Sequence, residues 1–205
     1  MRPDAFRKSL TLSGRYVELV PLTPAHTAPL WPPASRPEVS QYLRVGPPRT
    51  EAEMAGMIAA LLAAQREGTD LPFATLLLPS RRPVGMTRFL RIDRPNDGAE
   101  IGGTWIDPSL WRTPVNTEAK LLMLRHAFEV EHVHRIQLQT DSRNERSQRA
   151  IARLGAVREG VLREDVLLPS GYRRSSVYFS ILAPEWPSVR ARLESFLARD
   201  WVPPG

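Results

Sequence analysis

The feature that most constrains the fold of this chain is a change of hydrophobic period between residues 114 and 140. Over residues 114–131, apolar side chains recur at helical spacing and predict a helix with one core-facing stripe. The stripe consists of Val115, Ala119, Leu122, His126, Ala127 and Val130. Over residues 135–140 the pattern becomes a strict alternation, which predicts a strand with Ile136 and Leu138 facing inward. A helix and a half-buried strand in close succession predict a sheet that is covered by helices.

The rest of the chain adds strands and helices in the same mixture. Alternating or apolar runs predict strands over residues 15–20, 73–78, 84–90, 99–106, 160–168 and 175–182. Further helices are predicted over residues 50–66 and 144–154, and a last helix follows residues 184–187 and ends near residue 197. Thr50 is the expected N-cap of the first of these helices, and Gly68 and Gly155 are expected to end the first two.

No repeat and no linker divides the sequence, so we predict one α+β domain over residues 1–205, a mixed sheet with helices on its faces. Proline-rich residues 29–37 predict loops around short helices, residues 169–171 predict a turn, and residues 199–205 predict a frayed tail. No apolar run approaches the roughly 20 residues of a membrane span, and the N-terminus resembles no signal peptide. We therefore expect a cytoplasmic protein without a membrane partner.

The composition excludes several kinds of chemistry. The sequence contains no cysteine, which rules out disulfides, thiolate metal sites and a cysteine nucleophile. Its four histidines form no HExxH or similar ligand pair, so we expect no metal. The net charge of +6 comes almost entirely from arginines that are scattered along the chain with acidic residues between them. Such a surface attracts phosphates in general, but no aromatic-plus-basic motif supports nucleic-acid binding.

The segment Trp111-Arg-Thr-Pro-Val-Asn-Thr stands between the strand predicted over 99–106 and the helix predicted from residue 114. Thr113 suits an N-cap, and Pro114 is preset for the first helical position. The amides at such a helix start have no intrahelical partner and carry partial positive charge, which favours an anion. We expect the free donors to be the Val115, Asn116 and Thr117 amides, with the Arg112, Asn116 and Thr117 side chains. The alternative interpretation is an ordinary capped helix start.

Residues 99–156 resemble the GNAT superfamily of acetyl-CoA-dependent N-acyltransferases, in particular its RimJ/RimL-like branch. Residues 140–156 match the family's D-x-x-N-x-x-S-x-x-A-x-x-x-L-G-F/A segment closely, and this is the most specific signal. Residues 12–22, 158–163 and 171–173 are also similar to that branch, so the resemblance extends over nearly the whole chain. It implies a mostly antiparallel sheet with a splayed central strand pair and helices on both faces.

The resemblance also implies a place for the cofactor. The family's Q/R-x-x-G-x-G/A loop, whose backbone holds the CoA pyrophosphate, corresponds here to residues 111–116. Trp111, Pro114 and Asn116 replace the usual Gln or Arg, Gly, and Gly or Ala, so the loop is bulkier than usual. The expected cofactor-binding residues are Trp105, Ile106, Trp111, Arg112, Thr113, Val115, Asn116, Thr117, Asn144 and Ser147. Gly102 and Gly103 in the preceding strand suit either close approach of a ligand or a bulge.

Two residues are candidates for proton transfer. Glu100 stands eleven residues before Trp111, the spacing at which histone-type relatives place a glutamate, and we expect it to be the base. The alternative is a solvated carboxylate at the start of a strand. Relatives protonate the leaving thiolate with a tyrosine, but that position is Ile151 here, and Ser147 is the expected substitute. Asn144 is expected near the CoA sulfur, and an N-cap is the alternative role.

The resemblance thus implies an N-acetyltransferase that moves an acetyl group from acetyl-CoA directly to a primary amine in a ternary complex. An α-amine at a protein N-terminus suits the RimJ/RimL-like branch, and small amines, amino acids or antibiotics are further candidates for the acceptor. A homodimer is compatible with the sequence. The alternative is a catalytically weak or inactive CoA-binding or regulatory protein of the same fold, which the altered loop and the missing tyrosine suggest.

Overall fold

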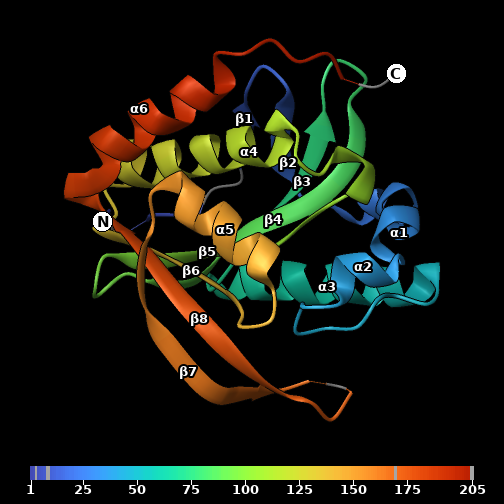
Figure 1. Cartoon of the computed structure of the whole chain (residues 1–205). Helices are drawn as coiled ribbons and strands as arrows, with labels where there is room; N and C mark the ends of the chain where they lie inside the picture. Colours follow the sequence, from blue (N-terminus) through green and yellow to red (C-terminus); the bar gives the residue numbers. More distant parts are fainter. Residues whose placement is uncertain (3, 8–9, 169, 204–205) are drawn as a thin grey trace.

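An eight-stranded sheet forms the centre of the computed structural model, which describes residues 1–2, 4–7, 10–168 and 170–203. The strands are β1 (Leu12–Ser13), β2 (Val17–Pro21), β3 (Leu71–Leu77), β4 (Arg82–Asp93), β5 (Gly98–Ile106), β6 (Arg135–Asp141), β7 (Val157–Leu167) and β8 (Arg173–Leu182). Their order across the sheet is β1-β2-β3-β4-β5-β6-β8-β7 (Figure 1). Only β5 and β6 pair in parallel among these strands, which confirms the predicted mostly antiparallel α+β fold.

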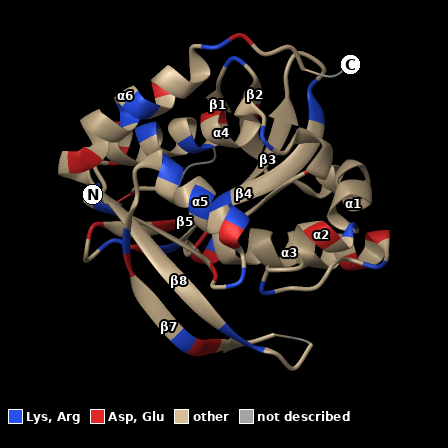
Figure 2. Ribbon diagram, in the orientation of Figure 1, with Lys and Arg blue, Asp and Glu red and all other residues tan. Residues whose placement is uncertain are grey.

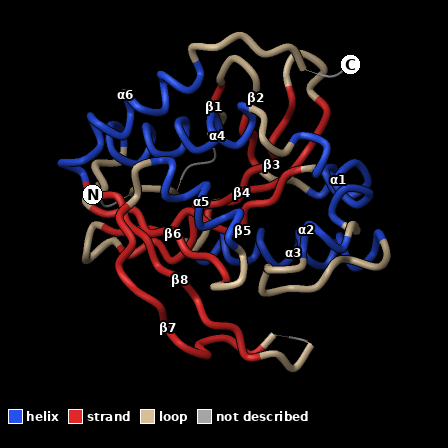
Figure 3. The backbone as a smooth tube through the Cα atoms, viewed as in Figure 1, coloured by secondary structure: helices blue, strands red, loops and turns tan. Residues whose placement is uncertain are grey.

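Helices cover both faces of the sheet (Figure 3). They are α1 (Thr27–Ala34), α2 (Pro37–Ser40), α3 (Glu51–Glu67), α4 (Pro114–Arg125), α5 (Glu145–Leu154) and α6 (Trp186–Leu197). Buried side chains of α4, α5 and α6 share one apolar cluster with one face of the sheet. Those of α1, α2 and α3 share a second cluster with the other face. The predicted covering of both faces is therefore confirmed.

The ends of these helices follow capping residues that the sequence predicts. The Thr50 side chain accepts a hydrogen bond from the Glu53 amide at 3.1 Å, and Gly68 ends α3 with a φ of 76°. Gly155 ends α5 in the same left-handed region, with a φ of 105°. Glycine adopts this conformation without the steric cost that a Cβ imposes, so both helix ends could be predicted locally.

The central strands β5 and β6 separate after a short parallel pairing. Gly98, Ala99 and Glu100 of β5 lie opposite residues 135–137 of β6. Beyond Glu100, β5 continues to Ile106 with no described strand along its β6-facing edge. The predicted splayed pair is therefore confirmed, and it leaves the backbone of residues 101–106 open on one side.

A bulge in β5 accompanies this separation. The register between β4 and β5 shifts by one residue between Arg88 and Met86, and Gly103 adopts a φ of 57°. A bulge bends its strand and increases the local twist, which turns β5 away from β6. A Cβ at Gly103 would lie 3.1 Å from the Arg88 Nε atom, so both the space and the backbone favour glycine. The bulge interpretation of Gly102 and Gly103 is confirmed.

The prediction for Val130 is wrong because the helix changes its geometry after α4. Residues His126–Val130 form a π-helical turn, in which the Glu131 amide donates to the His126 carbonyl at 3.0 Å. The wider turn holds an extra residue and shifts the positions that follow it out of the 3.6-residue period. Val130 is consequently 44% exposed, whereas the other predicted stripe residues are buried.

The C-terminal segment contacts Tyr16, the residue directly before β2. The Tyr16 hydroxyl donates to the Arg199 carbonyl at 3.2 Å, and the Tyr16 and Trp201 rings meet edge to face. Of the tail predicted over residues 199–205, positions 204 and 205 lie outside the described residues. Position 169 of the predicted turn also lies outside them. None of the described helices is long and apolar enough to cross a membrane.

Lys120 places an amine inside the core between α4 and the sheet. Its Nζ atom donates to the Thr104 hydroxyl at 2.6 Å and lies 3.4 Å from the Thr87 hydroxyl. The residue is 5% exposed, and it forms no ion pair with any carboxylate among the described residues. Burial disfavours the charged form and lowers the pKa of Lys120 to about 7.

We predict that Lys120→Met removes a pH dependence of stability. An unfolded lysine has a pKa of about 10.4, so above pH 7 the unfolded chain holds a proton that the folded chain lacks. The free energy of unfolding should therefore rise with pH between about 7 and 10, by up to about 1.4 kcal/mol per unit. Methionine is a suitable replacement because the two hydroxyls that contact the lysine keep a partner without it: those of Thr87 and Thr104 form a hydrogen bond with each other at 2.8 Å.

Urea denaturation of both proteins at pH 7, 8 and 9 measures this effect. The free energy of unfolding is plotted against pH for each protein. Subtracting the Lys120→Met slope from the wild-type slope removes the contribution of all other titrating groups. Parallel slopes would show that Lys120 stays charged in the folded protein.

Candidate active site at the splayed strands

The start of α4 has the predicted capping geometry. Thr113 is the N-cap, its hydroxyl donates to the Leu110 carbonyl at 2.7 Å, and Pro114 occupies the first helical position. The same hydroxyl lies 3.4 Å from the Val115 amide and accepts its hydrogen bond. The prediction of a free Val115 amide is therefore wrong, because the cap uses it. The Asn116 amide still has no acceptor within the helix.

Trp111 fixes the loop before α4 to two neighbouring elements. Its indole Nε1 donates to the Ile106 carbonyl at the end of β5, at 3.0 Å. The Arg146 guanidinium of α5 lies over its ring, 3.4 Å from the centroid. Arg112 follows with a φ of 64° and an exposed side chain. Trp111 therefore joins the open strand β5 to the starts of α4 and α5.

The next two predicted cofactor-binding residues, Asn116 and Thr117, differ in whether their side chains already form hydrogen bonds. The Asn116 Oδ1 atom is buried without a hydrogen-bond partner among the described residues. The Thr117 hydroxyl instead accepts from Arg153 Nη2 at 2.8 Å, and this side chain is buried. Thr117 therefore ties α4 to α5, whereas Asn116 keeps unused hydrogen-bonding capacity beside the helix start.

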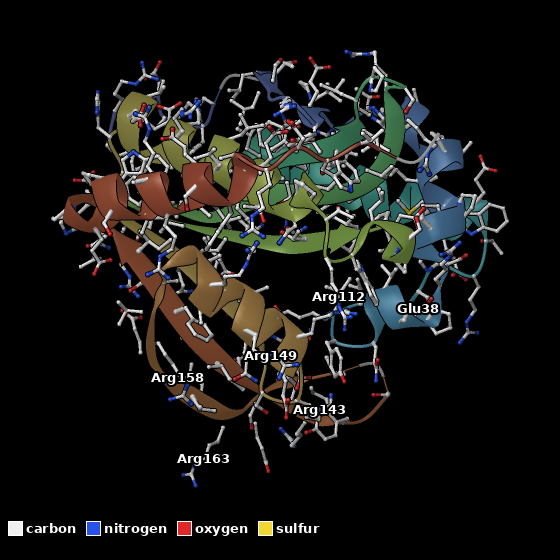
Figure 4. All side chains as sticks on the ribbon, turned by 45° about the horizontal axis from the view of Figure 1, so that its top comes forward. Glu38, Arg112, Arg143, Arg149, Arg158 and Arg163 are labelled. Carbon is white, nitrogen blue, oxygen red and sulfur yellow. The ribbon has the colours of Figure 1, made fainter. Side chains whose placement is uncertain are left out.

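Cations gather around this helix start, although basic and acidic residues alternate over much of the molecule (Figure 2). Figure 4 shows Arg112 on the same side of the molecule as Arg143 and Arg149. The last two residues are ion-paired with neighbouring carboxylates. Arg112 and Arg146 form no ion pair in the described part of the chain, and burial together with the Arg112 charge lowers the pKa of Arg146. Two uncompensated cations and a helix N-terminus make this region attractive to an anion.

The end of β5 offers its backbone rather than its side chains to the opening. Trp105 and Ile106 are both buried, the first in the cluster with α3 and the second in the cluster with α4. The Ile106 carbonyl already accepts from Trp111. Cofactor contacts of Trp105 and Ile106 remain a prediction, and the unpaired β6-facing edge of β5 is the feature that would make them.

Glu100 is buried, so the interpretation of a solvated carboxylate is wrong. Only 3% of the residue is exposed, and Arg91 Nη1 lies 3.3 Å from its Oε2 atom. Gln137 Nε2 donates to the carboxylate at 3.1 Å, and Gln139 Nε2 lies 2.9 Å from both of its oxygens. The carboxylate therefore stands in a polar environment that stabilises its charge.

The two candidates for proton transfer lie on opposite faces of the sheet. Ala99 and Ile101 belong to the cluster with α4, so the alternation of β5 places Glu100 on the other face. Ser147 belongs to α5, which packs with the cluster of α4. The opening between β5 and β6 is the only break in the described sheet between them.

At α5, the N-cap role of Asn144 is confirmed. Its Oδ1 atom accepts from the Ser147 amide at 3.0 Å. No described residue forms a hydrogen bond with the Ser147 hydroxyl, and the residue is half-buried. Ile151, at the position where relatives carry a tyrosine, packs in the core.

The residues that surround Glu100 were not among the predicted site residues. Gln137 and Gln139 alternate with the inward Ile136 and Leu138, so their common face could have been inferred from the strand pattern. Their contact with Glu100 depends on the parallel pairing of β5 with β6, which no local pattern shows. Arg146 on Trp111 and Arg153 on Thr117 were missed for the same reason.

Comparison with known families agrees with this geometry. Residues 17–157 match the acetyltransferase (GNAT) domain family. A crystal structure from T. thermophilus, provisionally named an acetyltransferase, superposes with a TM-score of 0.84 and 40% identity, over 91% of this chain and 96% of that one.

Two curated bacterial proteins are also similar. YdaF of Bacillus subtilis (strain 168), provisionally named a ribosomal N-acetyltransferase, is 32% identical over 50% of this chain and 55% of its own length. The [ribosomal protein uS5]-alanine N-acetyltransferase of Escherichia coli (strain K12) is 27% identical over 61% of this chain and 64% of its own length. The chain thus matches less than two thirds of either protein.

Proposed function

Because the chain belongs to the acetyltransferase (GNAT) family, we propose that it transfers the acetyl group of acetyl-CoA to a primary amine, an α-amine at a protein N-terminus. The observation that carries the proposal is a buried carboxylate beside the opening between β5 and β6, with an anion-attracting helix start at the same opening. The name of the E. coli relative, which acts on an alanine of a ribosomal protein, supports the choice of a protein N-terminus.

The residues at the start of α4 fit the pyrophosphate of CoA. Arg112 and Arg146 are cations without an ion pair among the described residues, and the Asn116 amide has no acceptor within the helix. The open edge of β5 would hold the extended pantetheine as an added strand. When bound, acetyl-CoA supplies an acetyl group activated as a thioester. The bulkier residues at positions 111, 114 and 116 require the pyrophosphate to lie over the helix start rather than inside a glycine loop.

Glu100 would prepare the amine for attack. An ammonium group that binds its carboxylate loses a proton to it, directly or through water, and becomes a nucleophile. Gln137 and Gln139 hold the carboxylate in place from β6. Arg91, at 3.3 Å, makes the longest of these contacts and is the one that an incoming ammonium can replace. Transfer would be direct, as the family resemblance implies, and the absence of a cysteine that could carry an acyl group agrees with this.

Ser147 would return a proton to the departing thiolate. Its hydroxyl has no partner among the described residues, while its amide is fixed by the Asn144 cap. A serine at the start of α5 therefore replaces the tyrosine whose position Ile151 fills in the core.

A second candidate function is a CoA-binding protein with little or no catalysis. The observation that favours it is the complete coordination of Glu100 by three side chains, which competes with an acceptor amine. Turnover of acetyl-CoA over a panel of N-terminal peptides and small amines distinguishes the two functions. CoA binding without transfer to any acceptor would support the second.

We predict that Asn116→Phe weakens CoA binding by crowding the helix start. Titration calorimetry should show a rise in the Kd for CoA, whereas the Kd for pantetheine, which has no pyrophosphate, should hardly change. The Tm should stay close to that of the wild type because Asn116 is only half-buried. Equal weakening for both ligands would place the pyrophosphate elsewhere.

We predict that Glu100→Gln lowers kcat by roughly 10²-fold, the usual contribution of a positioned acid–base group. The Kd for CoA should not change, because the carboxylate faces the amine. Activity should recover partly as the pH rises, since more of the amine is then neutral. Glu67→Gln, at an exposed position near the end of α3, is the matched control. A near-normal kcat of Glu100→Gln at every pH would exclude Glu100 as the base.

We predict that Ser147→Ala has a different signature. Its defect in kcat should shrink with an acetyl thioester of a more acidic thiol, because such a thiolate leaves without a proton donor. Raising the pH should give little recovery. A defect that is independent of the leaving thiol would assign Ser147 a role in binding rather than in proton transfer.

A further inference from the structure

A polar face extends from Glu100 across β6 and β8. Opposite residues of paired strands share a face, and Gln139 and Asp141 of β6 lie opposite Tyr178 and Ser176 of β8. The opposite face of β8 carries Val177, Phe179 and Ile181, which are buried with α4. The face that bears Glu100 is therefore lined by hydroxyls, amides and charges. Ser176 has no exposed surface, and its Oγ atom has no partner among the described residues.

Arg44 reaches this face from the segment between α2 and α3. Its Nη2 atom donates to the Gln139 Oε1 atom at 2.8 Å, and Gln139 Nε2 contacts both oxygens of Glu100 at 2.9 Å. A single glutamine therefore separates the guanidinium from the proposed base. Arg44 is exposed and pairs with no carboxylate in the described part of the chain, so its charge is available to a ligand.

Arg174 adds a second cation next to Arg44. It is 4% exposed, its Nη1 atom donates to the Tyr42 carbonyl at 3.1 Å, and its Nε atom has no partner among the described residues. Burial, and after it the charge of Arg44, lowers the pKa of Arg174. Asp141 and Asp165 act on it electrostatically without forming an ion pair with it, and Asp141 is already ion-paired with Arg143 at 2.8 Å.

Arg174 is a buried cation with no ion pair among the described residues, and the nearby charge of the exposed Arg44 makes this arrangement less favourable unless an anion joins them. A guanidinium matches the planar geometry of a carboxylate with two parallel hydrogen bonds, and a carboxylate is an anionic group that an amine acceptor can carry. Since Gln139 contacts both Glu100 and Arg44, an acceptor whose amine bound at Glu100 would have its neighbouring atoms close to Arg44. The site thus has a negative end at Glu100, which suits an ammonium group, and a positive end at Arg44, which suits a carboxylate.

The structure assigns Arg44, supported by Arg174, to binding a carboxylate of the acceptor. The preferred acceptors are then amines with a carboxylate close to the reactive nitrogen. This carboxylate belongs either to an aspartate at a protein N-terminus or to a free α-amino acid. The inference rests on the proposed function, and it specifies the class of acceptor for the same site.

The test compares acceptors with and without the carboxylate, with kcat/KM expressed per neutral amine because an adjacent carboxylate also raises the pKa of the reacting amine. One pair is a peptide that begins with aspartate and the same peptide with asparagine, and the other is L-alanine and L-alaninamide. Wild-type kcat/KM should be about tenfold higher or more for the acidic member of one pair, as expected for a charge-assisted hydrogen bond. The pair with the larger ratio identifies the source of the carboxylate.

Variants at position 44 show whether this arginine makes the discrimination. Arg44→Gln should bring the ratio close to one, mainly by lowering kcat/KM for the acidic acceptor, and Arg44→Lys should keep part of the ratio. Arg49→Gln, on the same connecting segment without a contact to Gln139, is the control and should keep the full ratio. A wild-type ratio near one for both pairs, or equal losses for both members in Arg44→Gln, would overturn the inference.

Binding measurements separate this inference from the proposed function. Calorimetry with the CoA-bound protein gives the Kd of each peptide without any transfer. Preferential binding of the aspartate peptide without turnover would keep the carboxylate site and refute the N-acetyltransferase proposal. Turnover with equal kcat/KM and equal Kd within both acceptor pairs would keep the N-acetyltransferase proposal and refute the carboxylate site.

Discussion

The parting of β5 from β6 is the constraint on which the rest of this structure depends. The two strands pair in parallel over only three residues of β5, and a bulge at Gly103 then turns β5 away. A continuous sheet would satisfy the backbone of residues 101–106 and bury it. The separation instead leaves one strand edge open in the middle of the molecule. Both the helix start at α4 and the carboxylate of Glu100 are positioned by their connection to this strand.

Packing on the α4 side holds the open strand in place. The Trp111 indole donates a hydrogen bond to the Ile106 carbonyl at the end of β5. The Lys120 amine donates one to the Thr104 hydroxyl, directly after the bulge. A buried lysine without a carboxylate partner is an uncommon choice, since an apolar side chain would cost less. The position of Lys120 gives a physical reason. Its amine connects α4, whose N-terminus attracts an anion, to β5, the strand that borders the opening. Rigid support of this kind keeps two binding regions at a fixed separation.

The distribution of charge gives the two faces of the sheet different roles. On the α4 and α5 face, Arg112 and Arg146 surround a helix N-terminus and attract an anion. On the other face, Glu100 attracts a cation, and Arg44 lies one glutamine away. A phosphate-bearing donor and an ammonium-bearing acceptor would therefore approach from opposite faces and meet at the opening. This geometry suits direct transfer in a ternary complex, which membership of the acetyltransferase (GNAT) family also favours.

The sequence by itself determined most of the elements and several of the helix caps. Periodicity predicted every described strand except the two-residue β1, and Thr50, Thr113, Gly68 and Gly155 act over a few residues, so local rules sufficed for these caps. Only the tertiary structure decided the partners of Glu100: Arg91 lies on the neighbouring strand β4, and Gln137 and Gln139 come 37 and 39 positions later in the chain. It also decided the π-helical turn that exposes Val130, the burial of Lys120 and the use of the Val115 amide by its own cap. These features depend on strand register and on which helix packs where, and such contacts between distant residues leave no periodic signal in the sequence.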